Sequence, residues 1–162
     1  MNTTELETQL GALLTELSET QDELLAVLAE KRQCMVDADL DAMGPLRDRG
    51  ERLQQRLQDC HTRRGELLAA AQRQGLPAES VKQLSAALPP DRDGTRRRQV
   101  DDASQRMRLI QHQSLTNWVL AQRTLLHLTQ LLEIIATGGR LQPTYGDSAS
   151  HRARGALVDQ EV

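Results

Sequence analysis

The sequence predicts an all-α protein: an elongated antiparallel helical bundle, or coiled coil, of three long helices. One short connecting helix and a flexible C-terminal tail complete the prediction. Apolar residues, mostly leucines, recur at alternating spacings of four and three, the period of helices that pack along a seam. The 162-residue chain also has one Trp, one Tyr and no Phe. A globular core of this size normally uses several aromatic side chains, whereas a leucine seam does not need them.

The first long helix is expected over about residues 4–38. Thr4 and Glu7 have the spacing of a capping box, which satisfies free N–H groups at the start of a helix. Eight of the ten seam positions are apolar, which favours a long helix packed against another. The seam positions are Leu6, Leu10, Leu13, Leu17, Thr20, Leu24, Val27, Lys31, Cys34 and Ala38.

The second long helix is expected over about residues 41–74. Asp39 or Asp41 would cap its N-terminus, and Gly75 would end it because glycine readily adopts the left-handed conformation after a helix. Seven of its nine seam positions are apolar. They are Met43, Leu46, Gly50, Leu53, Leu57, Cys60, Arg64, Leu67 and Ala71.

The two long helices differ in charge. Residues 1–38 hold eight acidic and two basic residues, a balance of −6, whereas residues 39–75 hold six acidic residues and seven arginines, a balance of +1. Opposite charges along the flanks attract, so the sequence favours antiparallel pairing of these helices over self-association of the first.

A short helix is expected over residues 78–87, and the Pro- and Gly-containing segment after it reads as a loop. The third long helix is expected over about residues 95–137, so that the bundle spans residues 1–139. Its seam runs through Met107 and Ser114 and then resumes at Trp118, one residue late. We therefore expect a local eleven-residue repeat that straightens the supercoil.

The later part of the third helix is unusually apolar. Twelve of the 21 residues from 115 to 135 are apolar, a wider face than a two-helix seam needs. Trp118 is expected to be either a core anchor or an interface residue, and Asn117 either fixes the register of the seam or lines a partner-binding groove. The candidate partner-binding residues of this helix are Asn117, Trp118, Leu125, Leu126 and Leu132, as groove or core residues.

Residues 140–162 are rich in Gly, Ser, Arg and Ala and are expected to form a flexible tail. Tyr145 and Leu157 are its candidate contacts with a partner. Tyr145 follows Thr144 directly after the helix, where it either folds back on the bundle or docks a partner.

The sequence favours no enzyme, cofactor or metal site. The four histidines lie in separate segments without neighbouring ligands, and no phosphate-binding loop or nucleophile motif is present. Asp residues flank the basic run Arg96–Arg98, so no nucleic acid partner is expected. We expect no secretory signal, no membrane insertion, and two reduced cysteines in a cytoplasmic protein.

The layout resembles the FlgN family of flagellar export chaperones. The resemblance rests on an acidic, Leu-rich first helix followed by Asp39-Leu40-Asp41-Ala42-Met43, and on a second helix that ends in Leu67-Leu68. Asn117 then precedes a Leu-rich run, and Thr144-Tyr145-Gly146 leads into the tail. These features cover nearly the whole chain in order and spacing.

The resemblance implies a bacterial cytoplasmic chaperone for type III flagellar export, without nucleotide or metal. It would bind amphipathic C-terminal helices of hook-associated (hook–filament junction) proteins, prevent their premature assembly and deliver them to the export apparatus, whose components are further candidate partners. The alternative is a structural coiled-coil scaffold or adaptor that self-associates through the same apolar face. The sequence leaves open the client and the choice between monomer and dimer.

Overall fold

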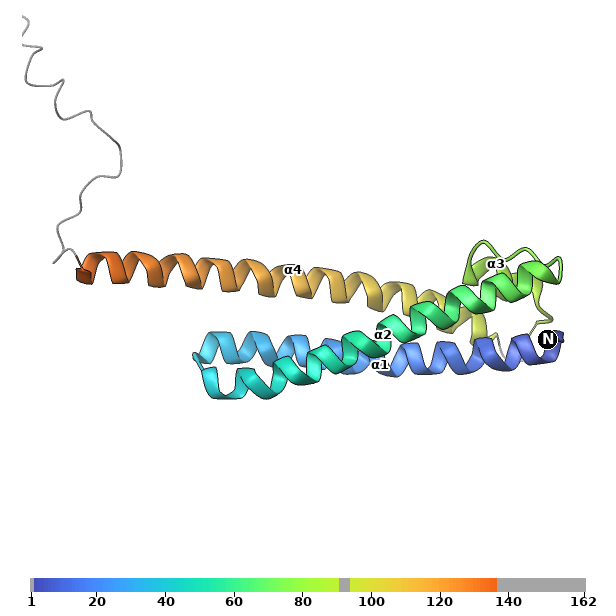
Figure 1. Cartoon of the computed structure of the whole chain (residues 1–162), viewed down its shortest axis with the longest axis horizontal. Helices are drawn as coiled ribbons and strands as arrows, with labels where there is room; N and C mark the ends of the chain where they lie inside the picture. The colour runs from blue at the N-terminus through green and yellow to red at the C-terminus, as the bar shows by residue number, and fades with distance from the viewer. Residues whose placement is uncertain (1, 91–93, 137–162) are drawn as a thin grey trace, which may run out of the picture. The chain divides into compact units, whose positions relative to one another are not determined.

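The structure, a computed structural model, describes residues 2–90 and 94–136 and is all-α over these residues (Figure 1). Its helices are α1 (Thr3–Asp37), α2 (Leu40–Arg73), α3 (Val81–Ala87) and α4 (Thr95–Ala136). The all-α prediction is confirmed, and the predicted tail lies outside the described residues. The chain divides into two compact units, residues 1–122 and residues 123–162, with the boundary inside α4.

Polar side chains cap the first two helices. Asp39 caps α2, as one of the two predicted alternatives, by accepting a hydrogen bond from the backbone N–H of Ala42 at 3.1 Å. The predicted Thr4 cap of α1 is wrong, because Asn2 takes this role and its Oδ1 accepts from the N–H of Glu5 at 2.8 Å. Asn2 has the extended backbone that an N-cap requires, whereas Thr4 lies inside the first helical turn.

The same kind of cap ends both α1 and α2. At the end of α2, Gly75 has a positive φ of 74°, and the N–H of Leu76 donates to the carbonyl of Ala71 at 3.1 Å. At the end of α1, Ala38 has φ 55°, and the N–H of Asp39 donates to the carbonyl of Cys34. Left-handed residues at these positions let the chain satisfy helix-end carbonyls as it leaves the helix. The turn between α1 and α2 therefore needs only Ala38 and Asp39.

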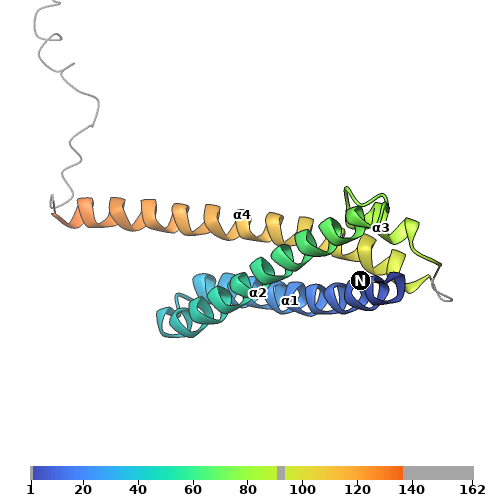
Figure 2. The same cartoon turned by 45° about the vertical axis from the view of Figure 1, so that its right-hand side comes forward.

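Helices α1 and α2 run antiparallel and side by side (Figures 1 and 2). Three ion pairs join their flanks: Glu16 with Arg63 at 2.6 Å, Glu23 with Arg56 at 3.0 Å, and Glu30 with Arg49 at 3.2 Å. Each helix contributes one residue every seven, so the pairs form a ladder of one repeating spacing. We call these six residues the ion-pair ladder. The expected attraction between an acidic α1 and a more basic α2 is confirmed in this form.

The main hydrophobic core of unit 1 lies where the start of α1, the end of α2, α3 and the start of α4 meet. Leu84 of α3 is fully buried there against a cluster from the other helices. The cluster consists of Leu6, Leu10, Leu13, Leu14, Cys60, Leu67, Ala71, Ala78, Leu84, Leu88 and Val100. The short α3 thus closes the end of the paired helices and leads into α4.

Within unit 1, polar contacts join α4 to α1 in parallel order. The side chain of Gln21 donates to the carbonyl of Ala103 at 3.0 Å, and Asp22 pairs with Arg106 at 2.7 Å. The buried residues of α4 are Val100, Ala103, Ile110 and Asn117. The last three are seven residues apart, so the heptad continues to residue 117 and the predicted register slip before Trp118 is wrong.

Candidate functional site

The part of α4 in unit 2 carries a concentration of exposed apolar side chains. Seven leucines and isoleucines between residues 125 and 135 are more than two-fifths exposed, and Ile135 is 75% exposed. They are Leu125, Leu126, Leu128, Leu131, Leu132, Ile134 and Ile135, and we call them the α4 apolar surface. Such a concentration of apolar side chains in water is typical of a surface that binds a partner.

These side chains cover much of the helix circumference. At about 100° per residue, six of the seven lie within about 180° of arc, and Leu126 lies outside that arc. A single partner helix covers a narrower stripe than this. The α4 apolar surface therefore has room for a partner that supplies more than one helix or wraps around α4.

The last turns of α4 in unit 1 also expose apolar side chains. Trp118 is 59% exposed, and Leu115 is exposed beside it. Of the two roles expected for Trp118, the structure excludes the core anchor. The sequence pattern misplaced this residue because it assumed that an apolar side chain, and not Asn117, continues the seam.

Asn117 is the predicted site residue that the structure buries, with 8% of its surface exposed. Its Nδ2 donates to the carbonyl of Leu28 at 2.8 Å, and its Oδ1 accepts from Nε of Arg32 at 3.0 Å. Both the donor and the acceptor of the amide are therefore hydrogen-bonded within unit 1. This arrangement favours the expected role in fixing the register of α4 on α1 over a role in a binding groove.

The seven predicted site residues thus fall into four groups. Leu125, Leu126 and Leu132 lie together on the α4 apolar surface of unit 2, and Trp118 is exposed in unit 1. Asn117 lies inside unit 1. Tyr145 and Leu157 fall outside the described residues.

Unit 1 contains a groove that the sequence did not predict. It has a volume of about 990 Å³ and is lined by α1, α2, α4 and the N-terminal part of α3. Apolar side chains such as Leu17 and Met107 and polar ones such as Gln21 line it together. The seam pattern missed it because each helix contributes only part of the lining. Predicting the groove requires knowing how far apart α2 and α4 lie.

Cys34 and Cys60 are not joined by a disulfide in the structure. Cys60 is 3% exposed, and burial together with the negative charge of Glu16 raises the pKa of its thiol, while the neighbouring Arg63 partly opposes this shift. A raised pKa leaves less of the reactive thiolate. Cys60 therefore has the character of a core residue and not of a nucleophile.

The basic run Arg96–Arg98 binds to its own loop. A guanidinium nitrogen of Arg96 donates to the carbonyl of Pro89, and Nε of Arg98 donates to the carbonyl of Gly94 at 3.4 Å. These contacts suit a loop-to-helix junction. No group of three or more potential metal ligands occurs among residues 2–90 and 94–136.

Comparison with protein families gives a match over most of the chain. Residues 1–153 match the family described as FlgN protein. The chain belongs to the FlgN family. No curated protein and no solved structure was found to match it.

Membership of the FlgN family supports a general role as a flagellar chaperone. An exposed apolar helix face is the feature that such a role requires, since a chaperone must offer apolar surface to its client. In the part of the chain that the structure describes, no helix is long and apolar enough to cross a membrane.

Proposed function

We propose that this FlgN-family chain is a cytoplasmic chaperone for type III flagellar export and that it binds amphipathic helices of hook-associated proteins. Binding keeps these proteins from assembling prematurely and helps to deliver them to the export apparatus. The observation that carries the proposal is the α4 apolar surface. Its seven exposed leucines and isoleucines lie on one helix of a protein whose family supports a flagellar chaperone role.

The proposed mode of binding follows from the spacing of the leucines on this surface. An amphipathic client helix places its apolar face against leucines spaced three and four apart, as in other helix-in-groove complexes. Leu125, Leu128 and Leu132 have this spacing. Leu126 and Trp118 are exposed outside it and would contact additional client surface. Tyr145 and Leu157 remain proposed contacts of the tail.

A pull-down from co-expression with hook-associated proteins tests the proposal. The full chain is expected to retain one of them, and Leu125→Ser with Leu132→Ser is expected to abolish retention, because two apolar contacts are lost. Leu40→Ser is the matched control, since Leu40 is 83% exposed at the start of α2, outside this surface, and its variant should bind as before.

Two outcomes contradict the proposal. One is that no hook-associated protein is retained. The other is that the Leu125/Leu132 variant binds as well as the unaltered chain. Deletion of residues 140–162 separately tests the tail contacts, because unchanged retention would remove Tyr145 and Leu157 from the interface without affecting the rest.

The same apolar surface supports the second candidate function, a scaffold that self-associates. Light scattering across a range of concentrations separates the two. A tight oligomer that forms without a client and disappears in the Leu125/Leu132 variant would favour the scaffold.

A further inference from the structure

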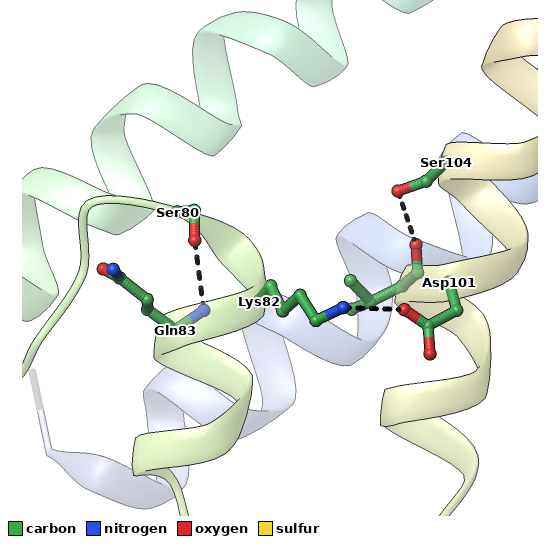
Figure 3. A network of polar contacts seen from close by, with 6 residues as sticks. Ser80, Lys82, Gln83, Asp101 and Ser104 are labelled. Atoms are coloured by element: carbon green, nitrogen blue, oxygen red, sulfur yellow. Dashed lines mark hydrogen bonds and ion pairs between the residues drawn. The ribbon is translucent and has the colours of Figure 1, made fainter.

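The groove in unit 1 has a basic lining that the proposed function does not use. Its charged lining residues are Arg64 of α2, Lys82 of α3, and Asp101 and Arg108 of α4, together with the titratable His61. Lys82 and Asp101 form an ion pair at 3.4 Å, which links α3 to α4 (Figure 3). Because the charges of Lys82 and Asp101 cancel, Arg64 and Arg108 determine the net charge of the lining.

Arg64 and Arg108 line the groove from two different helices, α2 and α4. Both are exposed, and neither forms an ion pair with any residue that the structure describes. Arg49, Arg56 and Arg63 of α2 are neutralised in the ion-pair ladder. The walls of the groove therefore carry two uncompensated positive charges, in a chain whose formal net charge is −3.

Apolar side chains also line the groove. Leu13, Leu17, Leu57, Val100 and Met107 contribute to its lining. The lining on α2 runs from Gln54 to Arg64, which is about 15 Å along the helix axis, or about three turns. A groove of this length fits a short helical segment that places its apolar side chains between α2 and α4.

Gln21 supplies a further polar group in this lining. It is 1% exposed, its Nε2 donates to the carbonyl of Ala103, and its Oε1 is buried without a hydrogen-bond partner among the described residues. A buried carbonyl oxygen without a partner raises the free energy of the folded chain.

We infer that this groove is a second docking site, which binds an acidic amphipathic helix of a partner protein. The apolar face of the partner helix packs between α2 and α4, and carboxylates on its two flanks pair with Arg64 and Arg108. The groove lies within unit 1, whereas the α4 apolar surface lies in unit 2, so this inference does not depend on the proposed function. The two sites would let one chain hold two segments at once.

Two designed peptides test this inference on the full chain. Both have Leu at heptad positions a and d and Gln elsewhere, with Glu at e and g in the acidic peptide and Lys in the basic one. Fluorescence anisotropy of the labelled peptides measures binding. The acidic peptide is expected to bind at least about tenfold more tightly, which corresponds to about 1.4 kcal/mol.

Charge reversal in the protein provides the deciding variant. Arg64→Glu with Arg108→Glu should reverse the preference, so that the basic peptide binds and the acidic one does not. Both side chains are exposed, so the fold should survive, and gain of binding to the basic peptide could not come from unfolding. Leu125→Ser with Leu132→Ser should leave the acidic peptide bound as before.

Four results would overturn the inference: no binding of either peptide, equal binding of both, a preference that charge reversal does not change, or loss of binding in the Leu125/Leu132 variant. The last result would place the peptide on the α4 apolar surface. Failure of the pull-down with hook-associated proteins would leave this inference intact, because the two experiments probe different units.

Discussion

At the scale of single residues, the hydrogen bonds of Asn117 favour the observed alignment of α4 with α1 in unit 1. An amide in a helical seam is stable only when its donor and acceptor are both satisfied, and here Leu28 and Arg32 satisfy them. The alternative alignment would bury Trp118 and expose the amide. It would gain apolar burial but lose both contacts with α1.

Asn117→Ala should lower the free energy of unfolding by about 1–3 kcal/mol, because the substitution removes two hydrogen bonds and leaves a small cavity. Ser114→Ala is the control, since Ser114 is an exposed polar residue on the same helix and its substitution should change stability by less than about 0.5 kcal/mol. Urea denaturation followed by circular dichroism measures both. Equal effects of the two substitutions would show that Asn117 has no special role.

At the scale of helices, local chemistry made both ends of α2 predictable, although the start of α1 was assigned to Thr4 in place of Asn2. The seam was harder to predict because it depends on long-range contacts. Asp39 and Gly75 could be assigned from sequence because a cap depends only on residues within one turn. The continuation of the seam after Ile110 could not, because it depends on an amide of α4 that meets the carbonyl of Leu28, 89 residues earlier. The apolar periodicity favoured Trp118 as the next seam residue, whereas the hydrogen bonds with α1 favour Asn117 at this position.

The candidate site, too, could be predicted from sequence only where it depends on a single helix. The wide apolar face after residue 122 could be recognised from sequence, since it is wider than one seam can cover, but whether its leucines are groove or core residues could not. The groove could not, because its lining comes from four helices and its basic character depends on which arginines the ladder neutralises. Arg56 and Arg63 are neutralised, whereas Arg64, the next residue along α2, is not.

The ion-pair ladder allows a direct test at this scale. Glu23→Arg should lower the thermal midpoint by placing like charges opposite each other, and adding Arg56→Glu should restore most of the loss. Exposed pairs of this kind contribute about 0.2–1 kcal/mol, so the effect should be small and should shrink in high salt. Thermal melts of the two single variants and the double variant measure the coupling. If the double variant only adds the two single losses, the pair contributes nothing.

At the scale of the whole molecule, the main core and the surface proposed to bind the client lie in different units. The residues of the main core cluster, and the buried residues of α4, all precede residue 118. The α4 apolar surface begins at Leu125. Folding and the proposed client binding are therefore assigned to different stretches of sequence.

Truncation after Gln122 should accordingly leave a folded protein that no longer binds its client. Circular dichroism should show a cooperative thermal transition close to that of the full chain, because no core residue is removed. The pull-down with hook-associated proteins should fail. A truncated chain that lacks a cooperative transition would contradict the assignment, and so would one that retains a hook-associated protein.

The regular spacing of the ion-pair ladder has a consequence for how the chain finds its alignment. Because the pairs repeat every seven residues, sliding α2 by one heptad would still place Arg56 opposite Glu30 and Arg63 opposite Glu23. Two ion pairs would therefore form in the shifted alignment, against three in the observed one, so the ion-pair ladder distinguishes poorly between the two alignments. The turn of Ala38 and Asp39 excludes the shifted alignment, because a two-residue connection is too short to allow α2 to move by seven residues along α1. The two-residue turn therefore fixes the alignment of α2 with α1, which the ion pairs alone would not fix.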